Sequence, residues 1–103
     1  MTAVTQVDPA GLKDLLATGS ETCVLDVRED WERASGFIPG SLHVPMQEIP
    51  GRLGELEPAA RIIVVCHVGA RSQMVAEYLV RQGFRDVANL RGGMDAWERE
   101  EQG

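Results

Sequence analysis

The chain has 103 residues, of which 44% are hydrophobic and 25% are charged, and its formal net charge is −6. This length and composition exclude disordered, collagen-like and coiled-coil chains, and we expect residues 1–103 to form a single globular domain. Nucleic acid and anionic membranes bind to basic surfaces, so neither is expected as a partner of this acidic chain. A small anionic substrate is not excluded, because it responds to local rather than net charge.

Two cysteines are too few for a disulfide framework. The spacing of the cysteines and histidines does not predict a metal site. The two cysteines, Cys23 and Cys66, form no Cys-x-x-Cys pair, and the two histidines, His43 and His67, lie far apart. No apolar run approaches the length of a membrane span, and no basic, apolar leader opens the chain. We therefore expect a soluble cytoplasmic protein that holds no metal.

Strand and helix signals alternate through the first part of the chain. A short β-prone run covers residues 4–7. Asp8 and Pro9 then have the pattern of a helix N-cap followed by the first helical position. Residues 23–27 form an apolar run that is typical of a buried strand. Residues 28–33 are charged, which predicts a solvated turn or a short helix.

The alternation continues to the end of the chain. A weak strand signal at residues 42–44 precedes the strongest one, residues 62–66, which contains four consecutive β-branched side chains. Ser72 is the predicted N-cap of the next helix. A last strand is predicted at residues 87–90 and a terminal helix at residues 94–99. This order favours an α/β fold with a mainly parallel sheet.

The chemistry is expected where the strongest strand meets the following helix. Cys66 ends this strand, and parallel sheets bind ligands beyond the carboxyl ends of their strands. A tight loop that enters a helix turns backbone N–H groups inward, and Gly69 permits that geometry. Arg71 adds a fixed positive charge, so the loop is expected to lower the pKa of Cys66 and favour a nucleophilic thiolate. The residues expected to bind an anionic substrate are His67, Val68, Gly69, Ala70, Arg71 and Ser72.

Several of these residues also have a plain structural interpretation. Cys66 has the alternative of a small core residue at a strand end, and Arg71 that of a surface charge. His67 either acts on donor binding or is a solvated loop side chain. Cys23 lies within an apolar run, where a small hydrophobic residue is expected. The order of cysteine, loop, arginine and helix favours the catalytic interpretation for Cys66.

Four segments in this order resemble the motifs of the single-domain rhodaneses, a family of sulfurtransferases. Residues 25–29 are similar to the family's Asp-x-Arg motif, and residues 36–41 to its Gly-His-Ile-Pro-Gly motif. Residues 66–72 resemble its active-site loop, and residues 89–97 its Gly-Gly-x-x-x-Trp signature. The resemblance implies a three-layer α/β/α sandwich with a five-stranded parallel sheet in the order 1-5-4-2-3.

The same resemblance implies that Cys66 carries sulfur as a persulfide. Its thiolate is expected to take sulfur from a small anionic donor such as thiosulfate, or from the persulfide of a protein or thiol. The acceptor is then cyanide or a cellular thiol, for example that of a thioredoxin-like protein. This ping-pong reaction requires no cofactor. Asp26 and Arg28 are implied to be a structural ion-pair set that shapes the loops near the site.

Two competing interpretations share this fold. Cell-cycle dual-specificity phosphatases and some arsenate reductases resemble rhodaneses but have five residues between cysteine and arginine. Here four residues separate Cys66 from Arg71, and a shorter loop suits one sulfur atom better than a tetrahedral phosphoryl group. Other rhodanese modules are non-catalytic binding domains, but these usually lack the cysteine that this chain retains.

Aromatic residues near the motifs are expected to be structural. Phe37 stands where the family often has His, and it is expected to be a hydrophobic plug. Trp31 and Trp97 are expected to pack, with a position at the active-site rim as the alternative for Trp31. His43 is expected to be a packed or partly exposed strand residue.

Overall fold

The computed structural model describes residues 3–102, which form an α/β fold of alternating strands and helices. Its elements are β1 (Thr5–Val7), α1 (Pro9–Ala17), β2 (Thr22–Asp26), α2 (Asp30–Arg33), β3 (Leu42–His43), the 3-10 helices η1 (Met46–Glu48) and η2 (Pro50–Glu55), β4 (Arg61–Val65), α3 (Ala70–Arg81), β5 (Asp86–Leu90) and α4 (Gly93–Gln102).

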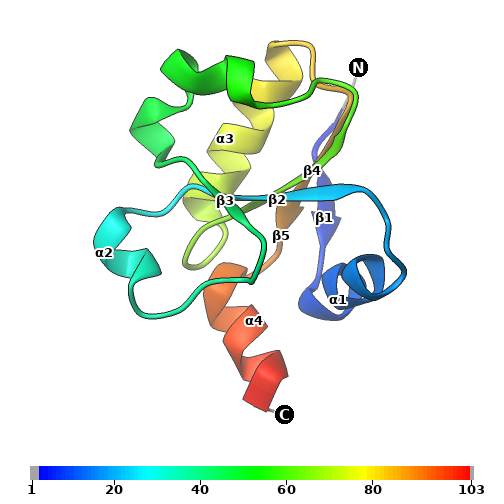
Figure 1. The fold of residues 1–103 in the computed structure, drawn as a ribbon, viewed down its shortest axis with the longest axis vertical. Coiled ribbons are helices and arrows are strands. Elements are labelled where there is room, and N and C mark those ends of the chain that lie inside the picture. Colours follow the sequence, from blue (N-terminus) through cyan, green and yellow to red (C-terminus); the bar gives the residue numbers. More distant parts are fainter. Residues whose placement is uncertain (1–2, 103) are drawn as a thin grey trace.

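The strands form one sheet with the order β1-β5-β4-β2-β3, in which every pairing is parallel. Helix α3 lies on one side of the sheet, and α1 and α4 lie on the other (Figure 1). The molecule therefore has three layers, and the predicted fold class and strand order are confirmed.

The central strand β4 divides the hydrophobic core into two halves. Successive side chains of a strand point to opposite faces of its sheet. Ile62 belongs to the cluster that contains Leu79 of α3, whereas Ile63 belongs to the cluster that contains Leu12 of α1 and Trp97 of α4. Because both faces of β4 are covered, its sequence is a continuous apolar run rather than an alternating one.

The first helix begins as its sequence predicts. The Asp8 side chain accepts a hydrogen bond from the Gly11 N–H at 2.8 Å, and Pro9 occupies the first turn. Leu12 is fully buried against the sheet. Capping and one buried leucine thus fix α1 on the face it shares with α4.

The carboxyl ends of β2, β4 and β5 lie at one edge of the sheet, where the connections that follow them meet. Helix α4 begins at this edge, against the loop that follows β4. The Met94 N–H donates to the Cys66 carbonyl at 2.8 Å, and the Asp95 N–H donates to the His67 carbonyl at 3.0 Å. Two segments distant in sequence are joined here by backbone hydrogen bonds.

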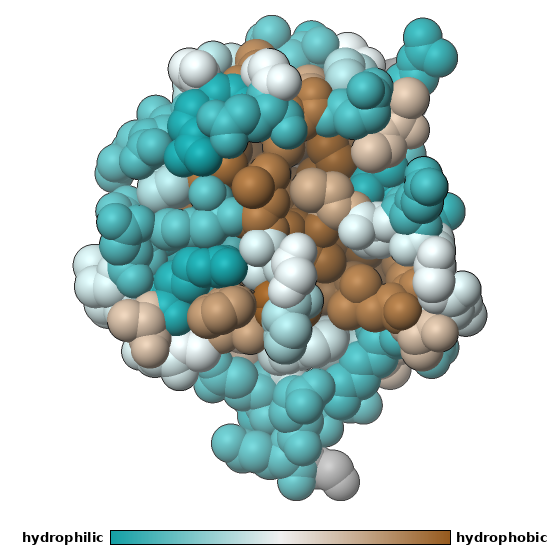
Figure 2. Space-filling model, viewed as in Figure 1, coloured by the Kyte–Doolittle hydropathy of each residue, from teal (hydrophilic) through white to brown (hydrophobic). Residues whose placement is uncertain are grey.

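The surface is mixed in character. Figure 2 shows hydrophobic side chains gathered over the centre of one face and hydrophilic ones on the projecting end of α4, whose residues 98–102 are exposed. Among the helices of residues 3–102, none combines the length and the apolar character needed to cross a bilayer.

Candidate active site

Cys66 lies immediately after β4, in the loop that leads to α3. The strand itself ends at Val65, one residue earlier than predicted. Cys66 is 1% exposed, and its Sγ accepts a hydrogen bond from the Gly69 N–H at 3.1 Å. The Ser72 hydroxyl lies 3.2 Å from the same sulfur. The sulfur thus lies at the base of a small cradle of donors.

These donors act on the pKa of the Cys66 thiol. Burial raises the pKa of the Cys66 thiol, but hydrogen bonds to the sulfur outweigh burial and bring the pKa below its ordinary value. The Ser72 hydroxyl contributes most, followed by the backbone N–H groups of Ser72, Gly69 and Val68. Such donors favour the charged form of a titrating group, here the thiolate.

The start of α4 holds the loop in the conformation that this cradle requires. Its backbone N–H groups bind the carbonyls of Cys66 and His67, which therefore face α4 and leave loop N–H groups free to face the sulfur. Gly93 has a φ of +58°, and a Cβ there would collide with both carbonyl oxygens. This close approach explains why glycine is needed at this turn.

Ser72 is not the helix cap that the sequence predicts. Helix α3 begins at Ala70, and the N-cap position is held by Gly69 with a φ of +103°. Ser72 lies in the first turn of the helix and is fully buried, with its hydroxyl between Cys66 Sγ and Asn89 Oδ1. The Ser72 hydroxyl therefore contacts the Cys66 sulfur and does not cap the helix.

Asn89 in β5 is a site residue to which the sequence analysis assigned no role, although it lies within the motif of residues 89–97. It is 4% exposed, and its Oδ1 contacts the Ser72 hydroxyl. Its Nδ2 donates to the Gly69 carbonyl at 3.3 Å and to Gln6 Oε1 at 3.0 Å. The available signal was a polar residue inside an otherwise apolar strand, because a buried amide requires partners.

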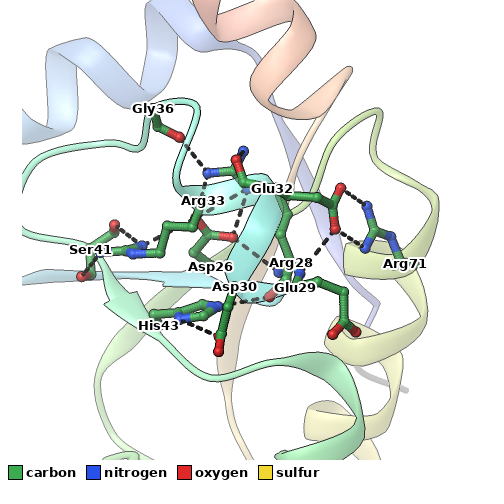
Figure 3. A network of polar contacts seen from close by, with 10 residues as sticks. All are labelled: Asp26, Arg28, Glu29, Asp30, Glu32, Arg33, Gly36, Ser41, His43 and Arg71. Carbon is green, nitrogen blue, oxygen red and sulfur yellow. Dashed lines mark hydrogen bonds and ion pairs between the residues drawn. The ribbon is translucent and has the colours of Figure 1, made fainter.

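Asp26 and Arg28, at the end of β2, form a buried ion pair within a larger polar network (Figure 3). Arg28 Nη2 donates to Asp26 Oδ2 at 2.9 Å and to the Gly36 carbonyl at 2.7 Å. Arg33 Nη1 donates to the same carboxylate at 3.2 Å and to Ser41 Oγ at 2.9 Å. The network ties β2 to the two connections that follow it.

This burial corrects part of the prediction for residues 28–33. The short helix α2 does form, but Arg28 is only 4% exposed rather than solvated. Its guanidinium is accommodated inside because a carboxylate and backbone carbonyls accept its hydrogen bonds. His43 is half-buried beside this network, with Nε2 2.7 Å from the Arg28 carbonyl.

Arg71 is bound to Glu32 of α2, a partner that the sequence analysis did not foresee. Its two Nη atoms donate to Glu32 Oε1 and Oε2, both at 2.7 Å (Figure 3). The hydrogen bonds from Arg71 lower the pKa of Glu32 to about 2. The charge that was expected to act on Cys66 is thus shared with a carboxylate.

A cavity of about 240 Å³ opens beside the loop, and we call it the mouth. Its lining residues are Arg28, Trp31, Glu32, Ser35, His67, Met94 and Glu98. Trp31 is 74% exposed, so the rim position weighed as an alternative is correct and the packing role is wrong. Trp97, by contrast, is buried as expected. His67 and Val68 are exposed loop residues, and Ala70 is the exposed first residue of α3.

Phe37 and Cys23 lie outside the cradle of donors around Cys66. Phe37 is 50% exposed and is not the plug that was expected; the Arg33 guanidinium stacks 4.1 Å from the centre of its ring. Cys23 is partly buried in β2, and burial raises the pKa of its thiol. Within residues 3–102, no group of three or more His, Cys, Asp or Glu side chains is placed to hold a metal ion.

A three-layer parallel α/β domain with a cysteine, held in a cradle of hydrogen-bond donors, directly after its central strand is an arrangement of the rhodanese type. The comparison with known families agrees. Residues 8–100 match the family described as the Rhodanese-like domain, and the chain belongs to this family.

Individual relatives agree over nearly the whole chain. A sulfurtransferase from Allochromatium vinosum is 38% identical over 96 residues, which cover 93% of this chain and 90% of the relative. The thiosulfate sulfurtransferase GlpE from Pseudomonas aeruginosa is 33% identical over 92 residues, covering 89% and 82% of the two chains. A solved rhodanese-like domain protein from Staphylococcus aureus has a TM-score of 0.86 and 36% identity, covering 91% of each chain.

Proposed function

We propose that this protein is a sulfurtransferase that carries sulfur as a persulfide on Cys66. The observation that supports this most is the donor set around the Cys66 sulfur, which combines the Gly69 N–H with the Ser72 hydroxyl. Donors that lower the pKa of a thiol favour its nucleophilic thiolate form, and the same donors suit a terminal persulfide anion.

The reaction has two displacements. In the first, the Cys66 thiolate attacks the sulfane sulfur of a donor such as thiosulfate; a Cys66–sulfur bond forms and sulfite leaves with the electron pair of the broken bond. In the second, an acceptor attacks the outer sulfur, and the Cys66 thiolate leaves with the pair of that bond. Charge and electrons balance in both steps, so no cofactor is required.

The donor and acceptor classes follow from this chemistry. Thiosulfate is supported as a donor by the relative GlpE, which is named a thiosulfate sulfurtransferase. Cyanide and thiols are suitable acceptors because each has a nucleophile that attacks divalent sulfur. A free catalytic thiol also suits the reducing cytoplasm, where we place the reaction.

Phosphoryl transfer is a poorer fit to this loop. A phosphoryl group presents three peripheral oxygens, each of which requires a donor. Only four residues lie between Cys66 and Arg71, and the Arg71 guanidinium is bonded to Glu32. The Cys66 loop is therefore matched to a single transferable atom.

The test compares both activities in one preparation. We expect measurable transfer of sulfur from thiosulfate to cyanide and negligible hydrolysis of small aryl phosphates. Cys66→Ser should abolish the transfer, whereas the matched variant Cys23→Ser should retain it. Phosphatase turnover that equals or exceeds sulfur transfer, and that is lost with Cys66→Ser, would overturn the proposal.

A further inference from the structure

Neighbouring elements hold both side chains of the ion pair between Glu32 and Arg71 in position. On one side, Arg71 lies in the first turn of α3, next to Ser72, and presents its guanidinium fork to the carboxylate. On the other side, Glu32 Oε1 also accepts the Glu29 N–H at 2.9 Å, and the Glu32 carbonyl accepts Arg28 Nη1 at 3.3 Å. Glu32 is thereby held in position by α2, with its side chain 11% exposed.

Two further arginines close to the carboxyl end of β2 are also bonded to a carboxylate. Both Arg28 and Arg33 form ion pairs with Asp26. The mouth is further lined by Glu98, which belongs to an exposed part of α4 and forms no ion pair among residues 3–102. The three arginines that lie in or next to β2, α2 and the Cys66 loop, Arg28, Arg33 and Arg71, are therefore each bonded to a carboxylate, whereas Arg91, which follows β5, forms no ion pair among residues 3–102.

We propose that Glu32 determines donor specificity, because it binds Arg71 and so reduces the positive charge offered to an incoming sulfur donor. The site then favours donors with at most one negative charge, thiosulfonates and persulfides, relative to dianionic thiosulfate. The proposal rests on the proposed sulfurtransferase function and names the donor class of the same site.

Two donors isolate this effect, because they deliver the same sulfane sulfur and differ by one charge. Thiosulfate is a dianion and releases sulfite; methanethiosulfonate is a monoanion and releases methanesulfinate. In each case the Cys66–sulfur bond forms as the donor's sulfur–sulfur bond breaks, and the leaving anion keeps the electron pair. The ratio of the two values of kcat/KM therefore reports how the site responds to charge.

The net charge of the Glu32–Arg71 pair predicts how the variants rank in their preference for thiosulfate over methanethiosulfonate. Glu32→Gln leaves Arg71 as an unpaired cation, Arg71→Gln leaves an unpaired carboxylate, and the double variant is neutral like the wild type. For one unit charge several ångströms away near the surface, we expect Glu32→Gln to raise kcat/KM about ten-fold for thiosulfate and about three-fold for methanethiosulfonate. The ratio of kcat/KM for thiosulfate to kcat/KM for methanethiosulfonate should be highest in Glu32→Gln and lowest in Arg71→Gln. The wild type and the double variant should share an intermediate value.

The control is Asp86→Asn, which removes one carboxylate from an ion pair with Arg61 at the amino end of β5, the opposite edge of the sheet. Asp86→Asn should leave the ratio of kcat/KM for the two donors unchanged. An unchanged ratio in both Glu32→Gln and Arg71→Gln would overturn the proposal, as would equal losses for both donors. If Glu32→Gln does not fold, the fall in the ratio expected for Arg71→Gln decides alone. Wild-type protein that takes sulfur from neither donor would instead overturn the sulfurtransferase function, and this inference with it.

Discussion

Ser72 has one hydroxyl proton and two acceptors within reach. Its Oγ lies 3.2 Å from Cys66 Sγ and also contacts Asn89 Oδ1. When Cys66 is a thiol, its S–H can donate to Ser72 while the serine donates to Asn89. When Cys66 is a thiolate, the serine proton is needed at the sulfur. The Asn89 amide therefore competes with the thiolate for one proton.

The first prediction concerns Ser72→Ala. Because the Ser72 hydroxyl is the largest favourable contribution to the thiolate, its removal should raise the pKa of Cys66. Persulfide formation at pH 7 should slow roughly ten-fold or more, the worth of one hydrogen bond to a charged group. The ultraviolet absorbance of the thiolate, followed against pH, measures the shift. Ser20→Ala, far from the sulfur at the amino end of β2, is the control; an identical titration in both variants would contradict this assignment.

The site residues that are consecutive in the chain could be predicted from the sequence, whereas their partners from distant segments could not. Cys66 and the loop that follows it could be identified because strand, cysteine, glycine and helix are consecutive in the chain. The partners Glu32 and Asn89 could not, because they lie 39 residues before Arg71 and 17 residues after Ser72. Only the folded sheet brings β2, β4 and β5 together at one edge.

Among the elements, α4 has a second role besides covering the sheet. Its first turn binds the carbonyls of Cys66 and His67, so the end of the chain supports the loop that follows β4. Gly92 directly precedes this helix and Gly93 is its first residue, and their φ values are +77° and +58°. The Gly-Gly signature is therefore part of the construction of the active site.

The second prediction compares Gly93→Ala with Gly83→Ala. Both glycines have positive φ, but a Cβ at Gly83 meets nothing within 4 Å, whereas one at Gly93 collides with the loop carbonyls. We expect Gly83→Ala to cost about 1 kcal/mol in free energy of unfolding and Gly93→Ala about 3 kcal/mol or more. Only Gly93→Ala should also slow persulfide formation. Urea denaturation gives the free energies, and equal losses of stability in the two variants would contradict the proposed role of this contact.

Helix boundaries show where local signals mislead. Asp8 caps α1 as predicted, because aspartate is a preferred N-cap and proline suits the first helical position. Ser72 has the same preference for a cap, but the positive φ of Gly69 starts α3 earlier and turns the serine inward. Tertiary demand for a donor beside Cys66 overrides the local preference.

For the whole molecule, the alternation of strand and helix signals predicted the layers, and the burial of β4 on both faces follows from its β-branched run. The order of the strands came from the resemblance to the rhodaneses, because hydrophobic periodicity contains no information on which strands are neighbours. The buried pair of Asp26 and Arg28 joins β2 to its following connections and was implied by the same resemblance.

The third prediction concerns stability against pH. The pKa of Glu32 is lowered to about 2 by its hydrogen bonds with Arg71, below the value of about 4.3 expected in an unfolded chain. A depressed folded-state pKa stabilises the fold above the unfolded pKa, and this contribution is lost as pH falls toward 2. Glu32→Gln should therefore lose more stability relative to wild type at pH 7 than at pH 3. Urea denaturation at both values is the measurement, and a difference independent of pH would contradict the ion pair.

The central claim is that Cys66 carries the transferred sulfur. The most direct test is the mass of the intact protein after a sulfur donor is added without an acceptor, followed by peptide mapping. We predict a gain of one sulfur atom per chain, located on the peptide that contains Cys66, removed by cyanide and absent in Cys66→Ala. A gain located on Cys23, or no gain from thiosulfate or methanethiosulfonate, would contradict the account.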